Sequence, residues 1–173
     1  MSTANFISPT DQLQQLGDRQ AIADLIGRLG LMLDEKRFDE AASILADDVT
    51  VKTPGGSAQG REAVAAQARR NHTVRTQHVI TNVLIELDGD RGQARANLTA
   101  TFAPDPGSRL VVNGEEQRDS FLTLGEVYRF EAVRTTDGWR LSRIETEPLW
   151  SSRPLSGGAR VAQTADDAAP AAS

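Results

Sequence analysis

The spacing of apolar residues changes near Thr76, and this change restricts the folds open to the chain. Before Thr76, apolar side chains recur three and four residues apart, which is typical of helices with one buried face. After Thr76, apolar and polar residues alternate over long stretches, as they do along strands. Helices gathered first and strands gathered later favour an α+β architecture with an antiparallel sheet over a wound parallel sheet, in which the two alternate.

Three helices are predicted in the first part of the chain. The first begins where Ser8 can cap it and Pro9 suits its first turn, and it ends near Asp34. A second, short helix starts near Phe38, and a third follows Gly60 after a short strand. The apolar face of the first helix consists of Ile22, Leu25, Ile26, Leu29 and Leu33.

The later part is predicted to form a sheet of long strands. The segment "TQHVITNVLIELDGD" ends in an Asp-Gly turn, and "GQARANLTATF" returns from it as a hairpin partner. Residues 151–173 are small, polar and rich in Pro, Gly and Ala, which predicts a disordered tail. The expected organisation is one domain at 18–150, preceded by residues 1–17 as an extension or as the start of the first helix.

The composition excludes several classes of protein. No apolar run approaches the roughly 20 residues that span a bilayer, and the N-terminus lacks the basic start and apolar core of a secretory signal. A cytoplasmic protein without a membrane partner is therefore expected. The net charge of −5 argues against nucleic acid as a partner. Cysteine is absent, which excludes thiolate metal sites and cysteine nucleophiles.

The chain has only two histidines, His72 and His78. They lie six residues apart across a turn and a strand, without the i, i+4 helical geometry of a zinc pair, so no metal and no cofactor are predicted. His72 lies in the basic segment "ARRNHTVR" at a helix exit, where an exposed side chain is expected. His78 lies near the start of the first long strand, where it either faces a cavity or is one more polar residue on a sheet.

A resemblance to a known family rests on four segments and their order: "LMLDEKRFDEAASILADDV", "GREAV", "TQHVITNVLIELDGDRGQA" and "GEVYRFEAVRTTDGWRLSRI". Over residues 18–150 the chain resembles the SnoaL-like branch of the nuclear transport factor two-like superfamily, which includes polyketide cyclases, ketosteroid isomerase and scytalone dehydratase. The resemblance implies a cone-shaped fold, in which a strongly curved antiparallel sheet wraps around the N-terminal helices and encloses a pocket. It also implies a homodimer formed through the sheet.

The resemblance further implies roles for two residues. The segment "TQHVITN" is similar to the part of scytalone dehydratase that holds its general base, which places that role on His78. The aspartate of "LMLDEKRF" falls where that enzyme has an aspartate bonded to its histidine, which places the partner role on Asp34. Such a carboxylate fixes the tautomer of an imidazole and stabilises its charged form. Leu33, which replaces a substrate-polarising tyrosine of that enzyme, is expected at the pocket wall.

Strand alternation groups further candidates for the pocket. His78 and Asn82 fall on one face of the first long strand, and because both faces are largely apolar the strand is expected to be covered on both sides. On the returning strand, four polar residues share a face that is either solvated, a subunit interface or a polar pocket wall. In the last case Asn97 is the most useful hydrogen-bond donor.

Tyr128 is the only tyrosine, and so the only phenol available to donate to a developing oxyanion. It shares a strand face with Glu126 and Phe130, and the sequence does not determine whether that face lines the pocket. Trp139 is predicted at the edge of the core or at the pocket rim, because indoles suit such boundaries. Glu145 on the last strand is a candidate second carboxylate, although exposed carboxylates on strands are common.

Together these features predict a cofactor-independent acid–base enzyme: a cyclase, dehydratase or isomerase that acts on a small hydrophobic oxygenated molecule, with natural-product biosynthesis as its setting. One alternative is an epoxide hydrolase or epoxide-opening cyclase, which a second carboxylate in the pocket would favour. The other is a protein that binds a small molecule without catalysis. In that case Asp34 and His78 form a structural pair that joins a helix to the sheet.

Overall fold

The computed structural model describes residues 8–112, 114–117, 121–152 and 161–165. Within these ranges, no helix is both long enough and apolar enough to cross a membrane. The helices are α1 (Pro9–Asp34), the 3-10 helix η1 (Phe38–Glu40), α2 (Ala41–Ile44) and α3 (Arg61–Asn71). The strands are β1 (Leu45–Thr53), β2 (Gly56–Gln59), β3 (Arg75–Asp88), β4 (Arg91–Ala103), β5 (Ser108–Val112), β6 (Glu115–Gln117), β7 (Leu122–Thr135), β8 (Gly138–Ser151) and β9 (Val161–Ala165).

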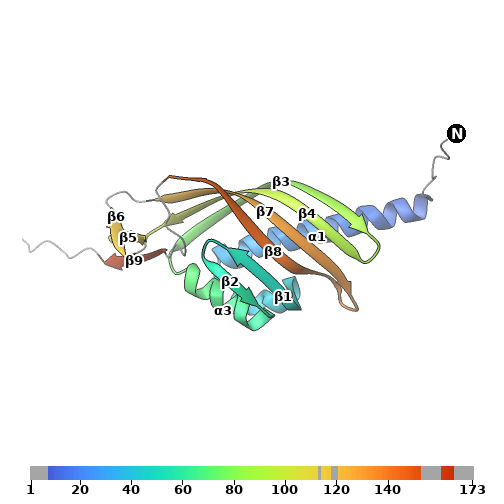
Figure 1. Cartoon of the computed structure of the whole chain (residues 1–173), viewed down its shortest axis with the longest axis horizontal. Coiled ribbons are helices and arrows are strands. Elements are labelled where there is room, and N and C mark those ends of the chain that lie inside the picture. Colours follow the sequence, from blue (N-terminus) through green and yellow to red (C-terminus); the bar gives the residue numbers. More distant parts are fainter. Residues whose placement is uncertain (1–7, 113, 118–120, 153–160, 166–173) are drawn as a thin grey trace, which may run out of the picture.

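Six strands form one sheet in the order β2-β1-β8-β7-β4-β3, with β1 parallel to β8 and the other neighbours antiparallel. Figure 1 shows this sheet curving around α1, with α3 beside β1 and β2. The three short strands β6-β5-β9 form a second sheet at one end of the molecule. The predicted α+β class, with a curved sheet around N-terminal helices, is confirmed, and the sheet remains open between β2 and β3.

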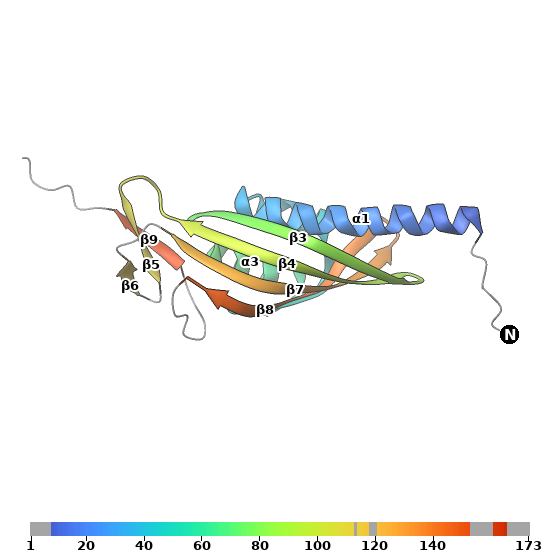
Figure 2. The ribbon, with the colours of Figure 1, turned by 90° about the horizontal axis from the view of Figure 1, so that it is seen from above.

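α1 begins with Ser8 as its N-cap and Pro9 in its first turn. The Ser8 hydroxyl accepts a hydrogen bond from the backbone N–H of Asp11 at 3.1 Å, which satisfies one of the N–H groups that a first helical turn leaves unpaired. Residues 9–17 are thus the start of the first helix. Figure 2 shows this part of α1 extending past the end of the sheet, where Leu13 and Leu16 are exposed.

The core lies between α1 and the inner face of the sheet. It includes the predicted apolar face of α1, in which Ile22 and Ile26 are almost completely buried. Two glycines allow helix and sheet to approach closely. A Cβ atom on Gly92 of β4 would lie 2.6 Å from Cδ1 of Ile22, and one on Gly30 of α1 would lie 3.3 Å from Cδ1 of Ile80. Polar side chains near the end of α1 can therefore reach β3.

A bulge in β3 moves its side chains to the opposite faces. After the Thr81–Asn97 pair, the next paired residue of β3 is Leu84, so two residues of β3 lie opposite one residue of β4. Asn82 lies in the bulge with a φ of 55°, a conformation that asparagine tolerates better than most residues. His78 faces inward, but Asn82 is exposed and does not line the pocket as predicted. Leu84 is 67% exposed, so the prediction that this strand is covered on both sides is wrong.

Part of the segment predicted to be a disordered tail is a strand. β9 pairs with β5 along its whole length, and the side chain of Val161 is buried. The hydroxyl of Thr73, just after α3, donates to the carbonyl oxygen of Val161 at 3.1 Å. The prediction was wrong for residues 161–165 because their order comes from pairing with a distant strand, which composition does not reveal. Residues 153–160 and 166–173 lie outside the described residues.

Candidate active site

Asp34 and His78, which lie 44 positions apart in the chain, meet through two contacts. Oδ1 of the Asp34 carboxylate lies 2.6 Å from Nδ1 of the imidazole. Oδ2 accepts a hydrogen bond from the backbone N–H of His78 at 2.9 Å. A carboxylate only accepts hydrogen bonds, so a neutral His78 ring carries its proton on Nδ1 and its lone pair on Nε2. The predicted contact between these two residues is present.

The C-terminal end of α1 holds the Asp34 carboxylate in place. The helix ends as Lys36 adopts a left-handed φ of 60°. The Lys36 ammonium then donates to the carbonyl oxygen of Leu33 at 3.1 Å and to the hydroxyl of Thr76 at 3.0 Å, which joins the helix end to β3. Burial opposes ionisation of Asp34, but hydrogen bonds from the ring and backbone of His78 lower its pKa below the ordinary value. Asp34 is therefore an anion at neutral pH.

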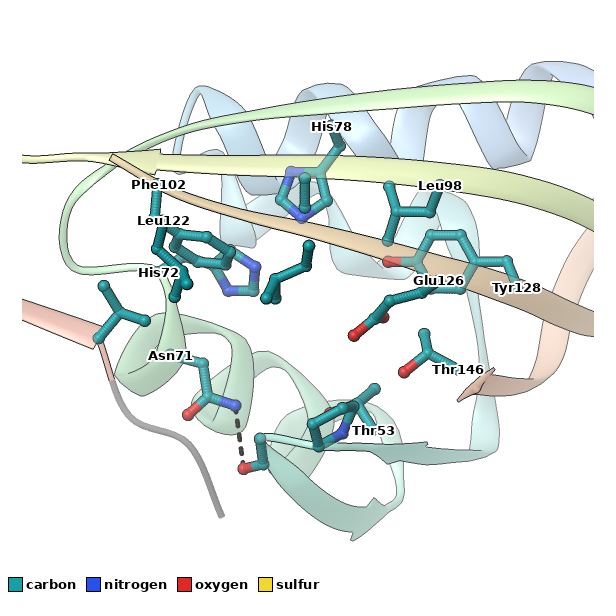
Figure 3. A pocket seen from close by; sticks show the side chains of 15 residues that line it. Thr53, Asn71, His72, His78, Leu98, Phe102, Leu122, Glu126, Tyr128 and Thr146 are labelled. Carbon is teal, nitrogen blue, oxygen red and sulfur yellow. Dashed lines mark hydrogen bonds between the residues drawn. The ribbon is translucent and has the colours of Figure 1, made fainter. Parts of the chain in front are cut away.

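The His78 ring lines a hollow of about 100 Å³ between the sheet and the end of α3. Figure 3 shows the far edge of the ring, which carries Nε2, directed into this space. Its apolar walls include Leu98, Ala100, Phe102, Leu122, Leu124 and Val161. Its polar side chains are Thr53, Asn71, His72, His78, Glu126, Tyr128 and Thr146. A mostly apolar hollow with a few converging polar groups is the usual form of a small-molecule site.

A second hollow of about 70 Å³ adjoins the first, and four residues line both hollows. Leu33 lines this second hollow, on the face of α1 that looks toward α3. Within the described residues, no three histidine, aspartate or glutamate side chains are grouped closely enough to hold a metal ion.

Glu126, on β7, brings a carboxyl group into the first hollow, and its side chain is only 5% exposed. Burial raises the pKa of this carboxyl, so it keeps its proton to a higher pH than an ordinary glutamic acid. Beside it in Figure 3 lies the Thr146 hydroxyl, whose hydrogen bonding to the carboxyl opposes part of this rise in pKa. Strand alternation had placed Glu126 on the same face of β7 as Tyr128. The burial of that face distinguishes Glu126 from an exposed carboxylate.

Tyr128 lines both hollows, so the strand face that the sequence left undetermined is the pocket face. Its phenol is buried, and burial raises its pKa well above the ordinary value. The neighbouring Glu126 and Asp34 act in the same direction. Tyr128 therefore stays protonated and is available as a hydrogen-bond donor.

His72 also lines both hollows, contrary to the prediction that it is exposed. Its ring centroid lies 5.3 Å from that of His78 and 6.1 Å from that of Phe102. Burial lowers the pKa of His72 to about 3, and the nearby His78 acts in the same direction. Arg69 and Arg70 at the end of α3 are exposed, as the basic segment suggested, but His72 itself lines the hollow together with Phe102 and Val161.

Besides Asn82, three more of the residues predicted for the pocket lie away from both hollows. Asn97 lies on the outer face of β4, opposite Leu98, and its side-chain oxygen accepts a hydrogen bond from a neighbouring arginine at 2.7 Å. Glu145 is paired with Arg143 at 2.7 Å on β8. Trp139 is buried in the core and donates from Nε1 to an aspartate of α1 at 3.0 Å. Strand register decides these orientations, and the sequence alone does not fix it.

The sequence profile of the SnoaL-like domain family matches residues 14–145. The chain belongs to the SnoaL-like family. The matched region contains Asp34, His78 and Glu126, together with α1, α3 and most of the large sheet. The family predicted from the four sequence segments is confirmed.

This SnoaL-like protein has relatives in sequence and in structure. The uncharacterized protein Rv2910c of Mycobacterium tuberculosis is 28% identical over 139 residues, which cover 77% of this chain and 87% of that protein. Hexachlorocyclohexane dehydrochlorinase LinA-type3 from Novosphingobium barchaimii is 22% identical with a TM-score of 0.67, covering 84% of this chain and 95% of that chain. The Kfla4162 protein from Kribbella flavida is 24% identical with a TM-score of 0.68, covering 80% and 95%. These structures share its fold.

Proposed function

We propose that this SnoaL-like protein is a cofactor-independent acid–base enzyme of the lyase type, which removes water or a similar leaving group from a small hydrophobic oxygenated molecule. The observation that carries the proposal is the Asp34–His78 pair, whose Nε2 is directed into a hollow that also holds the carboxyl of Glu126. An elimination needs both a base and an acid, because a C–H bond breaks while the leaving group takes up a proton. A dehydrochlorinase has the same fold.

His78 acts as the base. Its Nε2 carries the lone pair because the contact with Asp34 fixes the proton on Nδ1. This nitrogen removes a proton from a carbon next to a carbonyl group of the substrate. The charge that forms on the ring is stabilised by a carboxylate already 2.6 Å away, so little reorganisation is required during the step.

Glu126 acts as the acid. Burial raises the pKa of this carboxyl, which favours its protonated form compared with an ordinary glutamic acid. It gives this proton to a departing hydroxyl group, which leaves as water, while the electron pair of the broken C–H bond forms the new C=C bond. His78 thus begins the reaction as the proton acceptor and Glu126 as the proton donor. Such opposite roles are possible when different environments shift the pKa values of two groups apart.

Tyr128 and Thr146 are suited to the charge that develops on the substrate oxygen. The buried Tyr128 phenol keeps its proton and can donate to an enolate. The Thr146 hydroxyl lies in the same hollow beside the Glu126 carboxyl, with which it interacts, and so stands close to a bound substrate oxygen.

The proton-removal step can be measured without the natural substrate. In deuterated buffer, the wild-type protein should accelerate exchange of the α-hydrogens of cyclohexanone, followed by loss of the proton NMR signal. His78→Gln should lower this acceleration by about 10² to 10⁴-fold, the usual contribution of a general base. The exposed neighbour Gln77 is the matched control, and Gln77→Ala should retain the wild-type rate. Wild-type exchange in His78→Gln would reject the base.

The acid step is tested with 4-hydroxybutan-2-one, which becomes an ultraviolet-absorbing enone when it loses water. Glu126→Gln should slow this elimination but spare cyclohexanone exchange, because exchange requires the base alone. An unchanged elimination rate in Glu126→Gln would reject the acid role. If wild-type protein binds ketones but neither exchanges them nor opens epoxides, the protein is a binder without catalytic function.

The carboxyl of Glu126 also supports a second candidate, an epoxide-opening enzyme. Glu126 would protonate the epoxide oxygen while His78 removes a proton from the attacking water or substrate hydroxyl. This alternative requires a second carboxyl group in the pocket, and one is present, although on Glu126 and not on the predicted Glu145. Cyclohexene oxide separates the two candidates: formation of a diol containing oxygen from labelled water, without ketone exchange, selects epoxide opening.

Cyclisation and isomerisation begin with the same removal of a proton, so the proposal extends to them, with natural-product intermediates as the class of substrate. The homodimer, the absence of nucleic-acid and membrane partners, and the cytoplasmic location stay predictions. Each concerns surfaces or surroundings beyond the hollow described above.

A further inference from the structure

His72, at the C-terminal end of α3, has a fixed tautomer. Its ring Nδ1 lies 2.9 Å from the carbonyl oxygen of Ala68, and its backbone N–H donates to the same oxygen at 3.0 Å. A carbonyl oxygen only accepts hydrogen bonds, so Nδ1 carries the ring proton. The neutral ring then presents a lone pair on Nε2, which can accept a hydrogen bond but cannot donate one.

The surroundings of His72 keep the ring neutral. It is half-buried in the wall of both hollows, with the ring of His78 5.3 Å away. Burial and the positive charges that His78 and Lys36 can carry oppose its protonation, outweighing the attraction of Asp34. His72 therefore remains an acceptor at neutral pH, and it continues to accept when His78 takes up a proton.

The other polar groups of the first hollow have different roles. Tyr128 keeps its proton and acts as a donor, burial favours the protonated form of Glu126, and His78 in its proposed role uses Nε2 for proton removal. His72 is distinct because its acceptor is not consumed by the reaction. An acceptor fixed in a mostly apolar hollow selects for a ligand that carries a donor, since burying it unpaired costs free energy.

We propose that His72 is a specificity-determining residue whose Nε2 accepts a hydrogen bond from a substrate hydroxyl that is retained through the reaction. Because the two histidine rings lie 5.3 Å apart, that hydroxyl lies within a few bonds of the carbon that His78 deprotonates. The enzyme therefore prefers substrates with a free hydroxyl at this place over their methyl ethers. The position of the reacting carbon rests on the proposed function, whereas the hydroxyl preference itself does not.

Phenol and anisole test this preference, because they differ only in whether the oxygen can donate. Aromatic probes of this size bind engineered cavities of about 150 Å³, and the two adjoining hollows, of about 100 and 70 Å³, together provide comparable space. Titration by NMR should show phenol binding about tenfold more tightly than anisole to the wild-type protein. His72→Phe, which keeps a ring but lacks the acceptor, should bind the two equally, and His78→Gln should keep the preference.

Equal binding of phenol and anisole by the wild type, or an unchanged preference in His72→Phe, would overturn the proposal. If His72→Phe does not fold, nitrogen-15 NMR of labelled histidine in the wild type decides the matter. His72 should show the Nδ1–H tautomer from pH 7 to pH 5, and its Nε2 signal should shift with phenol but not with anisole. A proton on Nε2, or no response to phenol, would overturn the proposal.

Neither measurement involves turnover. Failure of ketone exchange therefore rejects the proposed function and leaves the acceptor role of His72 standing. A missing phenol preference with normal exchange rejects the acceptor role alone.

Discussion

Two aspartates of α1 reach the sheet, and their surroundings differ in one respect. Asp18 accepts hydrogen bonds from the side chains of Arg134 at 2.6 Å, Trp139 at 3.0 Å and Gln14 at 3.1 Å. Asp34 accepts from the ring and backbone of His78, at 2.6 and 2.9 Å. Both carboxylates have pKa values below the ordinary range, and both join the helix to a strand.

The two sites differ in whether the partner of the aspartate keeps an atom directed into a hollow. At Asp18, the guanidinium of Arg134 also bonds Asp90 at 2.8 Å and stacks 4.6 Å over the ring of Trp139, and Asp18 lines neither hollow. At the other end of the helix, the partner of Asp34 keeps a second nitrogen that is directed into a hollow. A saturated cluster can only join helix to sheet, as an anchor, whereas a paired imidazole with an accessible lone pair can serve as the proposed base.

The largest expected effect is on turnover. Asp34→Asn should lower the rate of cyclohexanone exchange by about 10² to 10⁴-fold. In this variant the amide oxygen accepts the hydrogen bond from the backbone N–H of His78, so the NH₂ group faces Nδ1. The imidazole then moves its proton to Nε2 and can no longer accept one. Asp18→Asn is the matched control, and its exchange rate should equal that of the wild type in folded protein. Equal losses in both variants would remove the distinction between anchor and base.

The second effect concerns stability. In Asp18→Asn, one acceptor becomes a donor that faces Arg134 or Trp139, so the free energy of unfolding at pH 7 should fall by about 1–3 kcal/mol. Hydrogen bonding to Arg134 outweighs burial and lowers the pKa of Asp18 below 3.8 in the folded protein. Its stabilising contribution is therefore complete above the unfolded pKa and is lost as the pH falls through the folded pKa.

Denaturant unfolding at several pH values measures how the stabilising contribution of Asp18 changes with pH. The difference in free energy between wild type and Asp18→Asn should be largest at neutral pH and should narrow below about pH 4, as Asp18 of the wild type takes up a proton. A difference that stays constant down to pH 3 would mean that the carboxylate charge does not stabilise the anchor.

The sequence predicted the surroundings of Asp34 better than those of Asp18. The apolar face of α1 and the strand alternation follow from local periodicity, and the family resemblance supplied the partnership of Asp34 with His78. Asp18 passed unnoticed, because its partners Arg134 and Trp139 lie more than 110 residues away across the sheet. Periodicity shows that a side chain is on a face, but it does not show which distant side chains meet it.

The errors at the candidate site have similar causes. Asn82 was placed in the pocket because alternation assumes an uninterrupted strand, and a bulge in β3 breaks the period. Glu145 was preferred to Glu126 because the inner face of each strand depends on sheet order and register, which are properties of the assembled sheet. His72 was expected to be exposed because its covering strand, β9, comes from a segment whose composition predicts disorder.

The smallest expected effect tests how closely α1 must approach β3 for the base to form. Gly27 and Gly30 are both helical, but a Cβ atom on Gly27 meets nothing within 4 Å, whereas one on Gly30 lies 3.3 Å from Ile80. Gly27→Ala should raise the free energy of unfolding by about 1 kcal/mol through helix propensity. Gly30→Ala should raise the free energy of unfolding by less, because α1 must move away from β3. The same movement should strain the Asp34–His78 contact and slow ketone exchange slightly. Equal stabilisation and unchanged exchange in both variants would show that the base tolerates a looser helix.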